Sequence, residues 1–162
     1  MSTITSLFED AQLAEAAYAN FWNASTNTVI TAPDLVKTAL IESGFSQNPN
    51  DQTQSAQATA FVSQWRVVDH IPDTVAGFSA TLFERLDNGA RTGEFSLAIR
   101  GSTDLVDFAA DGGDIFLDGI VQDQLVDLYN YWQCLDTRSS NTYAAAQLVT
   151  LTADTVALRA AY

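Results

Sequence analysis

The sequence predicts an α/β protein that forms one domain over residues 1–162, and two changes of hydrophobic period support this prediction. Much of the first third repeats its apolar side chains every three or four positions, which is typical of helices that bury one face. From residue 76 the period changes to two, which is typical of strands, and a helical period returns later. We therefore expect a mostly helical lead-in, 1–74, followed by a hairpin plus helices, 75–162.

The lead-in is expected to contain three helices. The second begins in the capping-box-like stretch 31–34, has Pro33 in its first turn and ends near Gly44. The third carries Phe61 and Trp65 on its apolar face and leads into a short strand, 65–71, after the polar surface loop 46–55. The first spans 5–22, and its apolar face is formed by Leu7, Ala11, Ala14, Tyr18 and Phe21.

Two regular strands flank a hairpin loop in the second half. Between them, Asn88, Gly89 and Gly93 supply the positive φ angles that such a loop needs. The strand 94–100 then runs into an Arg-Gly-Ser-Thr corner. Beyond it we expect an acidic helix or coil interrupted by glycines, an amphipathic helix with Leu125 and Trp132 on its apolar face, and a final helix at 141–162. The alternating apolar residues of the two strands are Phe78, Ala80, Leu82, Phe95, Leu97 and Ile99.

Composition and charge exclude several kinds of function. Seven basic residues against 20 acidic ones give a net charge of −13, so we expect no nucleic-acid partner. No apolar run is long enough to span a membrane. The stretch 1–12 lacks the basic and apolar regions of a secretory signal peptide, so none is expected there. One cysteine and one histidine exclude an internal disulfide and any site that needs two histidines.

The Arg-Gly-Ser-Thr corner has two interpretations. Gly101 permits a tight turn, and Ser102 or Thr103 could simply cap the helix that follows. Alternatively, a backbone N–H of this loop, helped by a hydroxyl, could form an oxyanion hole that stabilises a developing carbonyl charge during acyl transfer. In that hypothesis Ser102 is the oxyanion-hole residue, and Arg100, Gly101 and Thr103 shape the corner around it.

The stretch GFSATLFERLDNGARTGEFSLAIRGSTD, 77–104, resembles the entry to the class 3 (fungal-type) lipases and their bacterial relatives in the α/β-hydrolase superfamily. Those proteins have a hairpin, an apolar strand ending in Arg-Gly-Ser or Arg-Gly-Thr, then helices and the nucleophile elbow. The stretches 11–21, 61–74 and 125–132 occupy the corresponding places, so the resemblance spans nearly the whole chain. It implies the first strands and helices of an α/β-hydrolase-like sheet, a lipid or other carboxylic ester as substrate, and no cofactor.

The chain departs from this family at the residues of the catalytic triad. No Gly-x-Ser-x-Gly elbow occurs in it, because Gly77-Phe78-Ser79 is followed by Thr81 where the second glycine should stand. His70 precedes every candidate serine, whereas the family's triad runs Ser, Asp, His. We therefore expect the N-terminal portion of a hydrolase, ending before the elbow and inactive alone. A C-terminal secretion signal in a longer parent would be compatible with this.

The alternative is a non-enzymatic binding or partner module that shares the first half of the fold. A truncated sheet leaves a strand edge exposed, which invites self-association. His70 is expected to be a half-exposed structural residue, and Cys134 a spectator thiol. The acidic stretch 104–118 is expected to be a solvated face rather than a calcium site, although the resemblance also places a lid near it. The aromatic residues assigned to the core are Phe21, Trp22, Phe61, Trp65 and Trp132.

Overall fold

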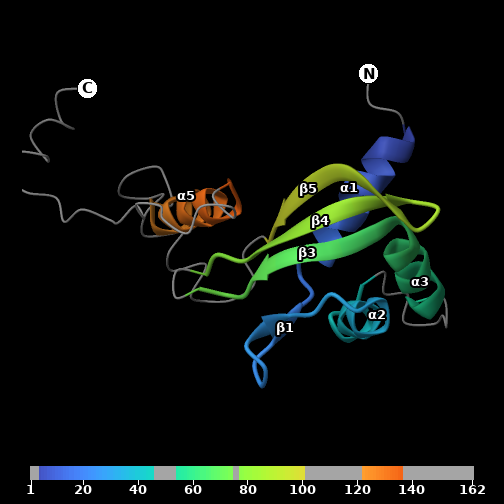
Figure 1. Cartoon of the computed structure of the whole chain (residues 1–162), viewed down its shortest axis with the longest axis horizontal. Coiled ribbons are helices and arrows are strands. Elements are labelled where there is room, and N and C mark those ends of the chain that lie inside the picture. Colours follow the sequence, from blue (N-terminus) through green and yellow to red (C-terminus); the bar gives the residue numbers. More distant parts are fainter. Residues whose placement is uncertain (1–3, 46–53, 75–76, 101–121, 137–162) are drawn as a thin grey trace, which may run out of the picture. The chain divides into compact units, whose positions relative to one another are not determined.

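The computed structural model describes residues 4–45, 54–74, 77–100 and 122–136. The chain divides into two compact units, Met1–Asp104 and Leu105–Tyr162. The first unit contains all the described strands and three of the described helices, and the second contains one described helix (Figure 1).

The first unit combines helices with antiparallel sheets and is therefore α/β in the general sense. A three-stranded sheet has the order β3-β4-β5, so β4 is its central strand. Its strands are β3 (Trp65–Ile71), β4 (Ala80–Asp87) and β5 (Ala90–Ile99). The helices are α1 (Ile4–Ala16), α2 (Pro33–Glu42) and α3 (Gln54–Gln64). A two-stranded ribbon that the sequence analysis missed joins β1 (Trp22–Asn23) to β2 (Thr28–Val29).

The predicted ends of α2 are largely confirmed. Pro33 lies in the first turn, where its missing N–H costs nothing, but the residue before the helix is Ala32, which makes no side-chain cap. The expected capping box at 31–34 is therefore wrong. At the other end, Gly44 has a φ of +84°, and the Phe45 N–H donates to Leu40 O at 3.0 Å. These features stop the helix where the sequence predicts.

The hairpin between β4 and β5 is confirmed in its details. Asp87 pairs with Ala90, which leaves a two-residue turn. Asn88 and Gly89 have φ angles of +49° and +79°, as the twist of two antiparallel strands favours. Gly93, with a φ of +78°, lies in β5 where the strand register shifts.

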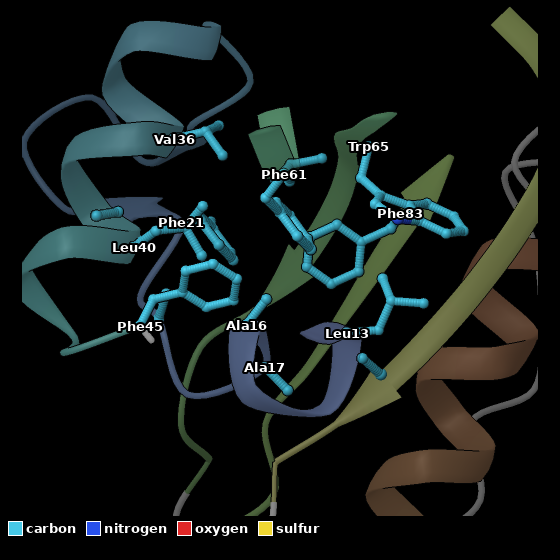
Figure 2. Packing of buried hydrophobic residues seen from close by; sticks show 14 of the residues in the cluster. Leu13, Ala16, Ala17, Phe21, Val36, Leu40, Phe45, Phe61, Trp65 and Phe83 are labelled. Carbon is cyan, nitrogen blue, oxygen red and sulfur yellow. The ribbon is translucent and has the colours of Figure 1, made fainter. Parts of the chain in front are cut away.

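One face of the three-stranded sheet carries the hydrophobic core. Trp65 and Phe83 pack there with residues of all three helices (Figure 2), and Val67 of β3 is fully buried in the same cluster. Phe83 meets Phe21 and Phe61 edge to face, with ring centroids 5.9 and 5.5 Å apart. The helices contribute Leu13, Ala16, Val36, Leu40, Ala58 and Phe61 to this cluster.

The first helix differs from its prediction in length and in buried face. It ends at Ala16, after which the N–H groups of Tyr18 and Ala19 donate to Glu15 O and Ala16 O, and the Asn20 side chain then accepts from the Trp22 N–H at the start of β1. Leu7 is 58% exposed, whereas Leu13, Ala16 and Ala17 are buried. The alanines let the helix approach the sheet closely, so small side chains define the buried face rather than large ones. The predicted face was therefore wrong except at Phe21, which is fully buried.

The opposite face of the sheet carries apolar residues together with polar ones, and some of its apolar side chains are exposed. Strand register puts Leu82 opposite Leu97, and Ala80 opposite Ile99, on this second face. Phe95 and Ile99 remain 55% and 46% exposed. The period-two pattern found in the sequence thus marks the second face, whereas the core face is carried by Val67, Phe83 and Ala98.

The second unit contains α5 (Gln122–Asp136), as predicted. Tyr131 is buried, but Leu125 and Trp132 are 53% and 56% exposed, so assigning Trp132 to the core was wrong. Cys134 is exposed. The acidic stretch 104–118 and the expected final helix 141–162 lie outside the described residues.

Candidate functional site

A cavity of about 320 Å³ lies where β3 and β5 end, beside the predicted corner. Arg100 enters it directly after the last residue of β5, and His70 enters it from β3. Its other lining residues come from the turn after α1 and from the segments that connect β3 to β4: Ala17, Tyr18, Ala19, Asn20, Pro72, Asp73 and Ser79.

Arg100 is fixed by contacts with the segments beside it. Its backbone N–H donates to Ser79 O at 2.9 Å, which extends the pairing of β5 with the start of β4. Its guanidinium Nη2 donates to the Asp73 carboxylate at 2.6 Å and, more weakly, to Gly77 O at 3.5 Å. The side chain is 14% exposed, so this ion pair is sheltered on the arginine side. The corner therefore begins from a defined position.

His70 is buried, not half-exposed as the sequence suggested, with a relative exposure of 4%. Its ring packs edge to face on Phe21, with centroids 5.7 Å apart, and its Nδ1 lies 2.8 Å from Thr81 Oγ1. Burial lowers the pKa of His70 from 6.5 to about 4, although the nearby Asp69 carboxylate opposes that effect. His70 is therefore a neutral imidazole at pH 7.

Ser79 is not arranged as a nucleophile. Its Oγ donates to Ile71 O at 2.9 Å, and the described partner of His70 is Thr81 rather than Ser79. An activated serine needs a base that accepts its proton. The described contacts give Ser79 no such base.

A second polar cluster surrounds Glu84 on the other face of the sheet. Glu84 is 1% exposed and accepts from Arg66 Nε at 2.6 Å, from Arg91 Nε at 2.9 Å and from the Gly93 N–H at 3.3 Å. Burial raises the pKa of this carboxyl, but the hydrogen bonds from Arg66 and Arg91 outweigh that effect and hold the pKa below its ordinary value. The cluster lies at the register shift, where the Gly93 N–H donates to Glu84.

The structure describes one of the four predicted corner residues. Arg100 lies at the end of β5, as expected, while Gly101, Ser102 and Thr103 lie outside the described residues. Sequence analysis missed the enclosure of His70 in the same cavity as Arg100. A period-two count along β3 gives the wrong face for His70, because the strand contains an extra residue between Val67 and Asp69.

Within the described ranges, no group of three or more His, Cys, Asp or Glu side chains is arranged to hold a metal ion. None of the described helices has the length and apolar character needed to cross a membrane. Comparison of the chain with protein-family models, with curated proteins and with solved structures finds no match.

Proposed function

We propose that the chain is the N-terminal part of a lipase- or esterase-type serine hydrolase, acting on lipid or other carboxylic esters, and that it supplies half of an oxyanion hole but is inactive alone. The observation that carries this proposal is the anchored Arg100. Its contacts with Asp73, Gly77 and Ser79 fix the point where the chain leaves β5. Oxyanion holes require donors that are held in place before the reaction begins.

The described part of the sheet, which is antiparallel, is compatible with this proposal. In sheets of the α/β-hydrolase kind, helices cover both faces, whereas α1, α2 and α3 cover one face of this sheet. The second face keeps Phe95 and Ile99 half-exposed, and β5 pairs with β4 alone among the described strands. A further strand beside β5 and helices on the second face are what a complete hydrolase sheet would add. The elbow serine and the triad histidine would then come from that added part.

The first test uses the chain as it stands. We expect it to hydrolyse p-nitrophenyl butyrate no faster than buffer and to resist labelling by a fluorophosphonate probe, because it contains no elbow serine. Stoichiometric labelling of any serine would contradict the proposal.

The decisive test joins the chain to whatever coding sequence follows Tyr162 in its gene. We expect esterase activity from the extended protein, and Ser102→Ala should lower its kcat by about 100- to 1,000-fold through loss of one oxyanion donor. Ser25→Ala is the matched control, because Ser25 is exposed in the β1–β2 turn. An extended protein without a Gly-x-Ser-x-Gly elbow and without esterase activity would refute the proposal.

Among the described strands β5 pairs only with β4, and this favours a second candidate, a partner module that associates with another copy of itself. Light scattering on the isolated chain would then show a dimer, and Phe95→Asp should shift it toward monomer. Leu35→Asp is the control, since Leu35 is also 55% exposed but lies on α2. A monomer at every concentration would exclude this candidate without touching the hydrolase proposal.

A further inference from the structure

The cavity beside Arg100 has features of a binding site in its own right, independent of ester hydrolysis. Its volume of about 320 Å³ falls within the range of small-molecule sites. Two of its polar side chains, His70 and Ser79, are 4% and 3% exposed, so the protein shelters them from bulk water. A buried histidine that lines a cavity is costly unless its polar atoms find partners there.

The tautomer of His70 follows from its neighbour. The Thr81 hydroxyl is fully buried, and its described partner is His70 Nδ1. A buried hydroxyl needs an acceptor for its proton, so Thr81 donates and Nδ1 accepts. The proton of the neutral imidazole is then on Nε2. Because Nδ1 is occupied by Thr81, Nε2–H is the ring donor left for the cavity.

The acceptors of the cavity lie on the other segments. Asp73 has Oδ1 on Arg100, and its carboxylate is 44% exposed. Ser79 gives its proton to Ile71 O and so offers the cavity a lone pair. The charges of Asp73 and Arg100 cancel. A further negative charge lies nearby, because the Asp69 carboxylate partly opposes the lowering of the His70 pKa by burial. An anionic ligand therefore gains nothing here from charge.

We propose that this cavity binds a small neutral carboxamide. The amide oxygen accepts from His70 Nε2–H, and the amide N–H donates to the Asp73 carboxylate. A carboxamide matches one donor and one acceptor at once, whereas a carboxylate would face Asp73 with like charge. Ala17, Ala19 and Pro72 provide apolar wall for a short alkyl group.

The experiment uses the single histidine of the chain as its own reporter. Propionamide is titrated into protein with ¹⁵N- and ¹³C-labelled histidine at pH 7, and the imidazole resonances are followed by NMR. We expect a saturable shift at Nε2 with a dissociation constant of about 1 to 50 mM, the range open to a ligand of so few atoms. Propionate should give no saturable shift. Absence of a propionamide shift, or tighter binding of propionate, would overturn the proposal.

A variant at Asp73 sharpens the test, because this side chain is 44% exposed and lies outside the hydrophobic core. In Asp73→Asn the carboxylate that accepts from the amide N–H and repels a carboxylate is gone, while the positive charge of Arg100 remains, so propionamide should bind about tenfold more weakly and propionate should now bind. Asp87→Asn, at the end of β4 before the hairpin turn, is the matched control and should leave both titrations unchanged. An Asp73→Asn protein that keeps the wild-type preference would refute the assigned role of Asp73, and with it the carboxamide site.

Discussion

Lowering the pH from 6.5 to 4.5 is expected to destabilise the first unit by about 2 kcal/mol through one group, His70. In the unfolded chain this imidazole titrates near 6.5, whereas burial holds its pKa at about 4 in the folded protein. Between those values the unfolded state binds a proton that the folded state does not. Stability is therefore fully present above pH 6.5 and is lost as the pH falls toward 4.

The magnitude follows from the two pKa values. The interval between 6.5 and about 4 corresponds to about 3 kcal/mol in total. Most of it, about 2 kcal/mol, falls above pH 4.5. The carboxyls of Glu9 and Glu84 also have lowered pKa values, but their contributions are lost below the ordinary value of 4.5. The upper window thus isolates the histidine.

The assay is urea unfolding of the whole chain at half-unit pH steps, followed by tryptophan fluorescence, because Trp65 is buried in the core. His70→Gln should flatten the slope between pH 6.5 and 4.5, whatever its effect on absolute stability. NMR titration of the single imidazole checks the folded pKa directly. A folded pKa near 6.5, or an unchanged slope in His70→Gln, would refute the reasoning.

Three further predictions test the packing. Phe83→Ala should cost about 3 to 5 kcal/mol of unfolding free energy, because its ring is fully buried between the rings of Phe21 and Phe61. Phe95→Ala, at 55% exposure, should change the unfolding free energy by about 0.5 kcal/mol or less, and comparable losses in the two variants would contradict the assigned core face. Glu84→Gln should lower the urea midpoint far more than Glu94→Gln, because Glu84 is 1% exposed beside two arginines whereas Glu94 is 73% exposed. Equal midpoints in the two variants would argue against the buried cluster. Gly89→Ala should cost about 1 kcal/mol from its φ of +79° alone, because a Cβ there meets nothing within 4 Å, and an unchanged midpoint would contradict the turn geometry.

The features that the sequence predicted well are those encoded by a few neighbouring residues. Asn88, Gly89 and Gly93 determine the hairpin locally, because few other residues adopt positive φ. Gly44 and Pro33 mark the ends of α2 in the same way. Such signals can be recognised without knowledge of the rest of the fold, because they arise from the backbone sterics of a few neighbouring residues.

The features that the sequence did not reveal depend on which face of an element the rest of the fold covers. Ala16 and Ala17 are buried together with Leu13 in the first helix region, while the larger Leu7 stays exposed. Glu84 lies on the second face beside apolar residues and is paired there with Arg66 and Arg91. These arginines are 18 and 7 positions away in sequence, so no local pattern links them to Glu84. Hydrophobic period alone cannot distinguish a covered face from an open one.

The single extra residue in β3 shows how much of the candidate site rests on such non-local geometry. Val67 pairs with Phe83 and Asp69 pairs with Leu82, so Val68 is a bulge with no partner position of its own. Without the bulge, strict alternation would put Asp69 on the core face with Trp65 and Val67. A carboxylate against Phe21 would be far more costly than a neutral imidazole. The bulge instead turns His70 inward, to Thr81 and the cavity, and places Asp69 on the opposite face. His70 therefore lines the cavity with Arg100 because of the register of β3. The order of residues in β3 does not reveal this position until the register is known.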